Sequence, residues 1–173
     1  MKVNLSLKAF FAILAIGVLS FRTAAQDMQP PPPIDNASMK MLMGSWKSEP
    51  YEMMGSKWTD VAVHSMKHNG QYMFIEITGS NDKNLTFSGT VIMTSDKDGN
   101  LTGWGFDDWG GVWNYTGKSN SNKVTITGKG AMGTELREIE INGNTAVHKI
   151  TWTMNGQDGK DMTNTMTITY NKQ

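Results

Sequence analysis

The fold class is decided by a stretch near the C-terminus, Met162-Thr163-Asn164-Thr165-Met166-Thr167-Ile168-Thr169-Tyr170. Every second residue in this stretch is a threonine, and the residues between the threonines are mostly apolar or aromatic. Successive side chains of a β-strand point to opposite faces, so a period of two predicts a strand with one buried face and one face in water. One-sided strands of this kind are typical of antiparallel sheets.

The same period of two continues through the chain from Gly44 onward, in a sequence rich in Thr, Val, Ile, Trp and Tyr. Clusters of Gly, Asn and Asp interrupt it about every ten to fifteen residues. The pairs Asn69-Gly70, Asp98-Gly99 and Asn142-Gly143 are strong hairpin signals, because these residues accept the positive φ of a tight turn. About nine such breaks predict ten sequential strands. The breaks lie at 54–56, 68–70, 80–82, 98–100, 109–111, 119–122, 129–130, 142–144 and 158–160.

Ten strands with one apolar face each need a partner for that face. An open sheet would expose the apolar face and two strand edges, so we expect an all-β, roughly ten-stranded antiparallel up-and-down barrel. A two-layer sandwich of the same strands is the main alternative. A barrel of this size encloses a space that side chains do not entirely fill, which leaves room for a small ligand.

The N-terminal segment predicts export. Lys2 and Lys8 precede an apolar run from Ala9 to Phe21, and small residues follow at Ala24-Ala25, which is the pattern of a cleaved signal peptide over residues 1–25. The apolar run has about 13 residues, whereas a membrane span needs about 20. We therefore expect a periplasmic or extracellular protein without a stable membrane anchor after cleavage.

The predicted organisation after cleavage is a linker and one domain. Residues 26–37 form a proline-rich linker that contains Pro30 to Pro33, whose fixed φ favours an extended chain. Residues 34–43 predict one short helix, capped by Asp35 or Asn36. The barrel domain is expected over residues 38–173.

Composition excludes several function classes. The chain has 173 residues, with 16 Lys and Arg against 16 Asp and Glu, and no Cys. Without residues 1–25 it carries roughly 13 positive and 16 negative groups, and such a balance argues against nucleic-acid binding. The absence of Cys excludes disulfides, a thiolate nucleophile and Cys-ligated zinc. The sequence also has no Gly-x-Ser-x-Gly elbow, no P-loop and no dinucleotide fingerprint. It predicts no catalytic residues and no metal site.

Three segments carry a resemblance to a known group of barrels. They are Leu42-Met43-Gly44-Ser45-Trp46-Lys47, then Gly105-Phe106-Asp107-Asp108 with Trp109 and Trp113, and the closing strand Met166-Thr167-Ile168-Thr169-Tyr170. Together, over about residues 38–173, they resemble the calycin barrels (lipocalins, fatty-acid-binding proteins and nitrobindin-like domains), and in particular secreted bacterial families of unknown function with such a barrel.

The resemblance implies a barrel that closes first strand to last, with Trp46 plugging one end, and a lumen that holds a ligand. It implies no established reaction. Lipocalins usually place an Arg over that Trp from near the closing strand, whereas Arg137 is the one Arg after residue 25.

The predicted ligand is a small hydrophobic or amphipathic molecule. Alternation places a set of aromatic and polar side chains on the apolar faces of the later strands, and we expect this set to line the lumen: Trp104, Trp113, His148, Trp152, Asn164 and Tyr170. Trp46 is expected to be structural. The prediction depends on register, because a slip by one residue moves the whole set to the outer face.

Charged and imidazole side chains leave alternatives open. His148 in a dry lumen could ligate haem iron or act as an acid or base, but a buried His bonded to Asn164 or Tyr170 is favoured, and no cofactor is expected. His64 and His68 on one strand would lie about 13 Å apart, too far for one metal ion. Arg137 is expected on a solvated surface with Glu135, Glu138 and Glu140; on a lumenal face it would contact an anionic head group.

The sequence thus predicts an exported barrel that binds a small, mostly apolar molecule. A haem-binding protein or a His-dependent enzyme on the same barrel is the second hypothesis. The third is a structural or interaction module whose barrel is filled by its own side chains.

Overall fold

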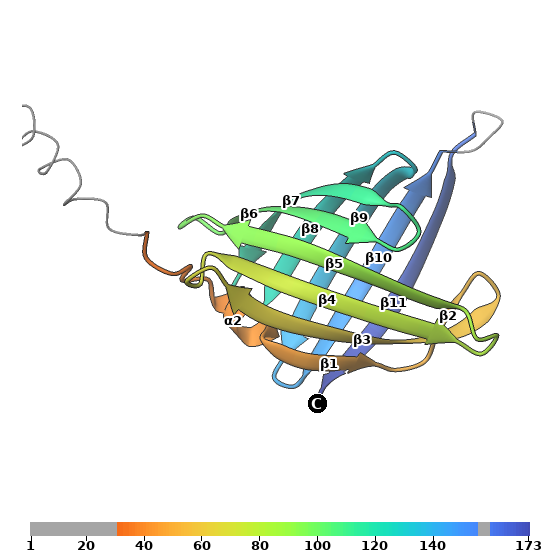
Figure 1. The fold of residues 1–173 in the computed structure, drawn as a ribbon, viewed down its shortest axis with the longest axis horizontal. Coiled ribbons are helices and arrows are strands. Elements are labelled where there is room, and N and C mark those ends of the chain that lie inside the picture. Colours follow the sequence, from red (N-terminus) through yellow and green to blue (C-terminus); the bar gives the residue numbers. More distant parts are fainter. Residues whose placement is uncertain (1–30, 156–159) are drawn as a thin grey trace, which may run out of the picture. The chain divides into compact units, whose positions relative to one another are not determined.

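The computed structural model describes residues 31–155 and 160–173 and shows a β-barrel with one short helix (Figure 1). The predicted signal peptide, the first part of the predicted linker and most of the break at 158–160 lie outside the described residues. The elements, in chain order, are α2 (Ala37–Leu42), β1 (Gly44–Ser48), β2 (Tyr51–Met53), β3 (Ser56–Lys67), β4 (Tyr72–Asn81), β5 (Thr86–Ser95), β6 (Asn100–Asp107), β7 (Val112–Asn120), β8 (Lys123–Gly130), β9 (Gly133–Asn142), β10 (Thr145–Met154) and β11 (Met162–Lys172).

The strands form a closed barrel. From β2 to β11 each strand pairs antiparallel with the next along the chain, and β1 pairs with both β3 and β11. Ten strands, β1 and β3 to β11, therefore make a ring, which confirms the predicted all-β, up-and-down barrel over the sandwich. It is compatible with a calycin-like fold.

One predicted strand is divided in two. The sequence predicts a single strand before the break at 54–56, but the structure has β1 and β2, separated at Glu49 and Pro50. Pro50 has no N–H to donate to a neighbouring strand, so regular pairing stops there. Glu49 still donates its N–H to the Thr169 carbonyl of β11, at 2.8 Å, and β2 continues alongside β3 alone. The structure thus has one strand more than predicted because Pro50 divides the first predicted strand into β1 and β2.

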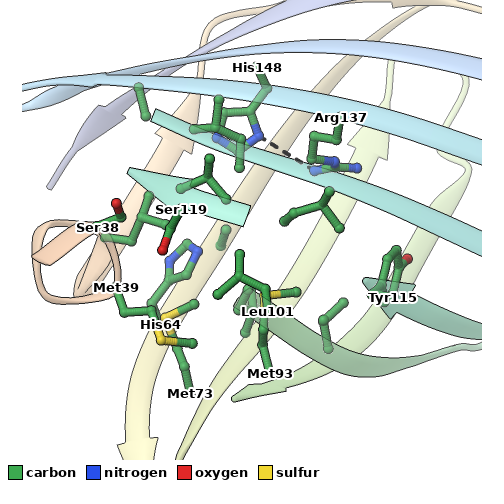
Figure 2. Close-up of a pocket in the computed structure, with 18 of the residues that line it drawn as sticks. Ser38, Met39, His64, Met73, Met93, Leu101, Tyr115, Ser119, Arg137 and His148 are labelled. Carbon is green, nitrogen blue, oxygen red and sulfur yellow. Dashed lines mark hydrogen bonds between the residues drawn. The ribbon is translucent and has the colours of Figure 1, made fainter. Parts of the chain in front are cut away.

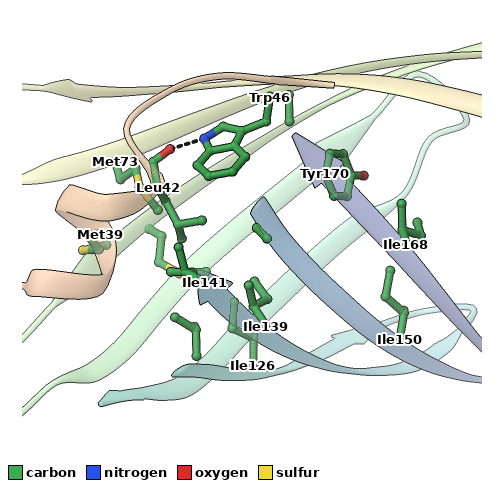
Figure 3. Close-up of a cluster of buried hydrophobic side chains, with 14 of the residues drawn as sticks. Met39, Leu42, Trp46, Met73, Ile126, Ile139, Ile141, Ile150, Ile168 and Tyr170 are labelled. Carbon is green, nitrogen blue, oxygen red and sulfur yellow. Dashed lines mark hydrogen bonds between the residues drawn. The ribbon is translucent and has the colours of Figure 1, made fainter. Parts of the chain in front are cut away.

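Buried apolar side chains fill the barrel near α2 (Figure 3). The inward faces of β8, β9 and β10 supply Ile126, Ile139 and Ala146, and α2 supplies Met39 and Leu42. Helix α2 has only six residues, too few to be stable alone, so its packing onto this core holds it in place.

The start of α2 is tied to two strands through one side chain. Asn36 caps the helix, because its Oδ1 accepts a hydrogen bond from the Met39 N–H at 3.1 Å. Its Nδ2 donates to Ser95 Oγ of β5 at 2.8 Å and to Ser119 Oγ of β7 at 2.7 Å. The predicted helix is confirmed, and of the two predicted caps it is Asn36 that serves.

Trp46 lies at the junction of helix and barrel. It is 1% exposed, and its Nε1 donates to the Leu42 carbonyl at 2.7 Å (Figure 3). Its β-sheet partners are Ala62, which is small, and Lys172, whose Nζ lies 5.3 Å from the indole centroid. A cation over an indole face is stabilising. Lys172 therefore supplies a cation over the ring of Trp46.

Trp46→Ala is expected to lower the free energy of unfolding by about 3–5 kcal/mol, because it removes a fully buried aromatic side chain. The matched control is Trp104→Ala, in β6, where the indole is 41% exposed on the outer face. We expect the control to lose less than about half as much. Urea unfolding followed by circular dichroism measures both, and equal losses would contradict the described placement of the two indoles.

Candidate functional site

Two adjoining cavities lie inside the barrel. The inner cavity, of about 100 Å³, is next to α2 (Figure 2), and the outer cavity, of about 350 Å³, lies toward the opposite end. Side chains at the boundary line both cavities: Ile77, Val91, Tyr115, Glu135, Arg137 and Tyr170. The boundary is therefore the polar part of a mostly apolar lumen.

Four of the six predicted lining residues face these cavities. Trp113 and Trp152 line the outer cavity, His148 lines the inner one, and Tyr170 lines both. On β10 and β11 the alternation has the predicted register: Ile150 and Ile168 are buried, and Lys149 and Thr167 are exposed.

The prediction for Trp104 is wrong. In β6 the inward positions are Leu101, Gly103 and Gly105, and Trp104 lies between them on the outer face. The reason is packing inside the lumen. A Cβ on Gly105 would come within 2.7 Å of the Tyr115 ring. The Tyr115 ring thus takes the space that an inward side chain at residue 105 would need.

Asn164 lines neither cavity. It is on the same face of β11 as Met166, but it is exposed near the end of the strand, opposite Trp152. His148 is not bonded to it; the imidazole instead packs against the Tyr170 ring, with centroids 4.6 Å apart. The predicted hydrogen bond to Asn164 or Tyr170 is therefore not formed; Tyr170 is a ring neighbour of His148, and the polar contact of the imidazole is with Arg137.

An ion pair lies inside the barrel, on the inward face of β9. Arg137 Nε donates to Glu135 Oε1 at 2.6 Å, and Glu135 Oε2 accepts from Trp152 Nε1 at 3.1 Å. The prediction that these charged residues lie on a solvated surface is correct for Glu138 and Glu140, which are exposed. It is wrong for Glu135 and Arg137, which face the lumen. Ile139 and Ile141 share the face of the pair, so strict alternation from these isoleucines could have found it.

Arg137 also reaches His148. Its Nη1 lies 3.5 Å from His148 Nδ1, a contact that is drawn as a dashed line in Figure 2. Burial, and then the charge of Arg137, lower the pKa of His148 well below its usual value. Burial lowers the pKa of His64, across the same cavity, to about 4. Both imidazoles are therefore neutral at pH 7.

A buried carboxyl that sequence reasoning missed lies beside the boundary. Asp60 Oδ2 accepts hydrogen bonds from the hydroxyls of Tyr51, at 2.8 Å, and Tyr170, at 3.1 Å. Its Oδ1 has no hydrogen-bond partner among the described residues and lies over Gly79, where a Cβ would come within 2.5 Å of it. Burial raises the pKa of Asp60, and the two tyrosine bonds oppose this effect. The sequence signal that could have revealed Asp60 is alternation, because it lies on the same face of β3 as the buried Trp58 and Ala62.

The mouth of the outer cavity is apolar. The hairpins at this end of the barrel carry exposed large apolar side chains, of which Met54, Trp109 and Met132 line the cavity; Met54 is 75% exposed. Single exposed apolar residues are ordinary on a protein surface. Here three of them line one cavity.

The sequence matches no protein-family model and no curated protein. Within residues 31–155 and 160–173, no three His, Asp or Glu side chains are grouped so that they could hold a metal ion. No helix in the same residues is long and apolar enough to span a membrane.

Acid is expected to destabilise the fold through the two lumenal histidines. Their pKa values are lower in the folded state than in the unfolded chain, where His titrates near 6.5, so the unfolded state binds more protons below that pH. The free energy of unfolding should fall between pH 6.5 and about 4, by on the order of 3 kcal/mol from His64 alone. The raised pKa of Asp60 acts with the opposite sign.

Urea unfolding at a series of pH values tests this. His148→Gln should lose less stability on acidification than the wild-type protein. His68→Asn, at an exposed turn residue with a φ of 52°, is the control and should behave as the wild type. Identical acid sensitivity of all three proteins would show that His148 is not the titrating group.

Proposed function

We propose that the chain is an exported calycin-like barrel that holds a small, mostly apolar molecule in its outer cavity. The observation that carries the proposal is the cavity of about 350 Å³, which opens between apolar hairpin tips and has polar groups at its inner boundary. Pockets for small molecules have this character: about 300–1,000 Å³, apolar walls and a few polar groups that orient the ligand. Export rests on the sequence of residues 1–25 and on the resemblance to secreted barrels.

The binding energy would come from apolar burial. At about 25 cal/mol per Å², a ligand that buries about 300 Å² of apolar surface gains roughly 7 kcal/mol. Association and ordering oppose this gain by at least about 4 kcal/mol. Since the cavity walls are strands of a closed barrel, little further ordering is needed on binding, and the remaining gain of about 3 kcal/mol corresponds to a dissociation constant in the millimolar range.

The haem alternative is less well supported. His148 faces the inner cavity, whose volume of about 100 Å³ corresponds to about three water molecules at 30 Å³ each. A porphyrin needs several times that space beside the ligating imidazole. The filled-barrel alternative is opposed by the outer cavity.

Binding of the neutral fluorophore N-phenyl-1-naphthylamine tests the proposal. Its fluorescence should rise in the presence of the protein, and Met166→Trp should weaken binding about ten-fold or more, because Met166 lines the outer cavity and the larger ring fills it. Thr167→Trp adds the same ring to the exposed face of β11 and is the matched control. Absence of binding to the wild-type protein, or equal binding by the two variants, would contradict a ligand in the outer cavity.

A further inference from the structure

The charges around the outer cavity do not favour an anion. Among the described residues, three carboxyls and one guanidinium line it: Asp60, Asp107, Glu135 and Arg137. If Asp60 is protonated, two carboxylates still face one Arg. His64 and His148, beyond the boundary, are neutral and add no positive charge. The wall of the outer cavity thus carries no net positive charge in either state of Asp60.

The charge of Arg137 is already compensated within the lumen. Glu135 lies against it at 2.6 Å, and the pair is largely removed from solvent, with 8% of the Glu135 side chain exposed. In such surroundings electrostatic interactions are stronger than in water. A carboxylate brought to Arg137 would therefore be repelled by Glu135 at short range.

The carboxyl groups that line the outer cavity already accept hydrogen bonds from the protein, which disfavours binding of a cationic ligand. Glu135 accepts from Arg137 with one oxygen and from Trp152 with the other. Asp107 Oδ1 accepts the N–H groups of Trp109, at 3.1 Å, and Gly111, at 2.7 Å, and its Oδ2 accepts from Trp113 Nε1 at 3.4 Å. Asp60 Oδ1 has no hydrogen-bond partner in the described part of the chain, but it is fully enclosed, against Gly79. An ammonium group would find no accessible, unengaged oxygen on Glu135 or Asp60.

Hydrogen-bond donors remain at the boundary. A guanidinium has five N–H groups, and within the described residues the hydrogen bonds of Arg137 involve its Nε and Nη1, while 22% of its side-chain surface stays accessible. The Tyr115 hydroxyl has no hydrogen-bond partner among the described residues, and burial raises its pKa, so it stays a neutral donor. Its ring is stacked on Trp113, which fixes its orientation.

We infer that the ligand bears an uncharged oxygen group, such as an alcohol, ketone, ester or amide, which accepts hydrogen bonds from Arg137 and Tyr115 while its apolar part occupies the outer cavity. This inference rests on the proposed function and specifies the ligand of the same site. Buried donors of this kind favour a ligand that satisfies them, because burying them unpaired is unfavourable.

Three probes with one chain length and different head groups test the inference: 1-decanol, decanoate and decylammonium. Isothermal titration calorimetry at pH 7.5 should give a dissociation constant for decanol at least about ten-fold below those of both ions, because a buried uncompensated charge is strongly disfavoured. Equal or tighter binding of either ion would overturn the inference. So would failure of all three probes while N-phenyl-1-naphthylamine binds. Failure of the fluorophore as well would overturn the proposed function itself.

Glu135→Gln gives an independent test. It keeps the size of the side chain and an oxygen that can accept from Trp152, but leaves the charge of Arg137 uncompensated. The ratio of decanoate affinity to decanol affinity should rise about ten-fold or more. Glu138→Gln, on the outward face of the same strand, is the control and should leave the ratio unchanged. An unchanged ratio in Glu135→Gln, with the protein folded by circular dichroism, would overturn the role given to Glu135.

Discussion

The structure depends on β1, a five-residue strand that pairs on both sides. Trp46 stands opposite Ala62 of β3 and Lys172 of β11, and these pairings turn a meander into a ring. Without the ring, the apolar faces of nine strands would have no inside to share. Closure also determines where the lumen opens, because α2 and Trp46 fill the end at which β1 begins and leave the outer cavity at the other.

Inside the barrel, charge is accommodated by pairing. Glu135 lies against Arg137, Asp60 receives two tyrosine hydroxyls, and the histidines are neutral. A buried ion pair of this kind contributes little stability compared with apolar residues of similar volume. The pair lies at the boundary of the two cavities, where the ligand of the proposed function would meet it. The same arrangement leaves donors free without leaving a net positive charge.

Period-two alternation was sufficient to predict the barrel, the hairpins and the inward faces of β10 and β11, since their polar and apolar residues separate cleanly. It failed where the inside of the barrel departs from the rule that apolar residues face inward. In β6 the inward positions are glycines that accommodate Tyr115, so Trp104 faces out. In β9, strict alternation from Ile139 and Ile141 places Glu135 and Arg137 inward, but the rule that charged residues face water favours the opposite placement. Asp60 alternates in the same way with the buried Trp58 and Ala62, but its tyrosine partners come from β2 and β11, which the sequence of β3 alone does not show.

The most direct measurement is an NMR titration of the six tryptophan indole N–H resonances with 1-decanol. Trp113 and Trp152 line the outer cavity, whereas Trp46 is sealed beneath α2 and Trp104 is on the outer face. We expect saturable shifts for Trp113 and Trp152 and essentially none for Trp46 and Trp104. Shifts centred on Trp104, or no saturable shift at any indole, would contradict a ligand site inside the barrel.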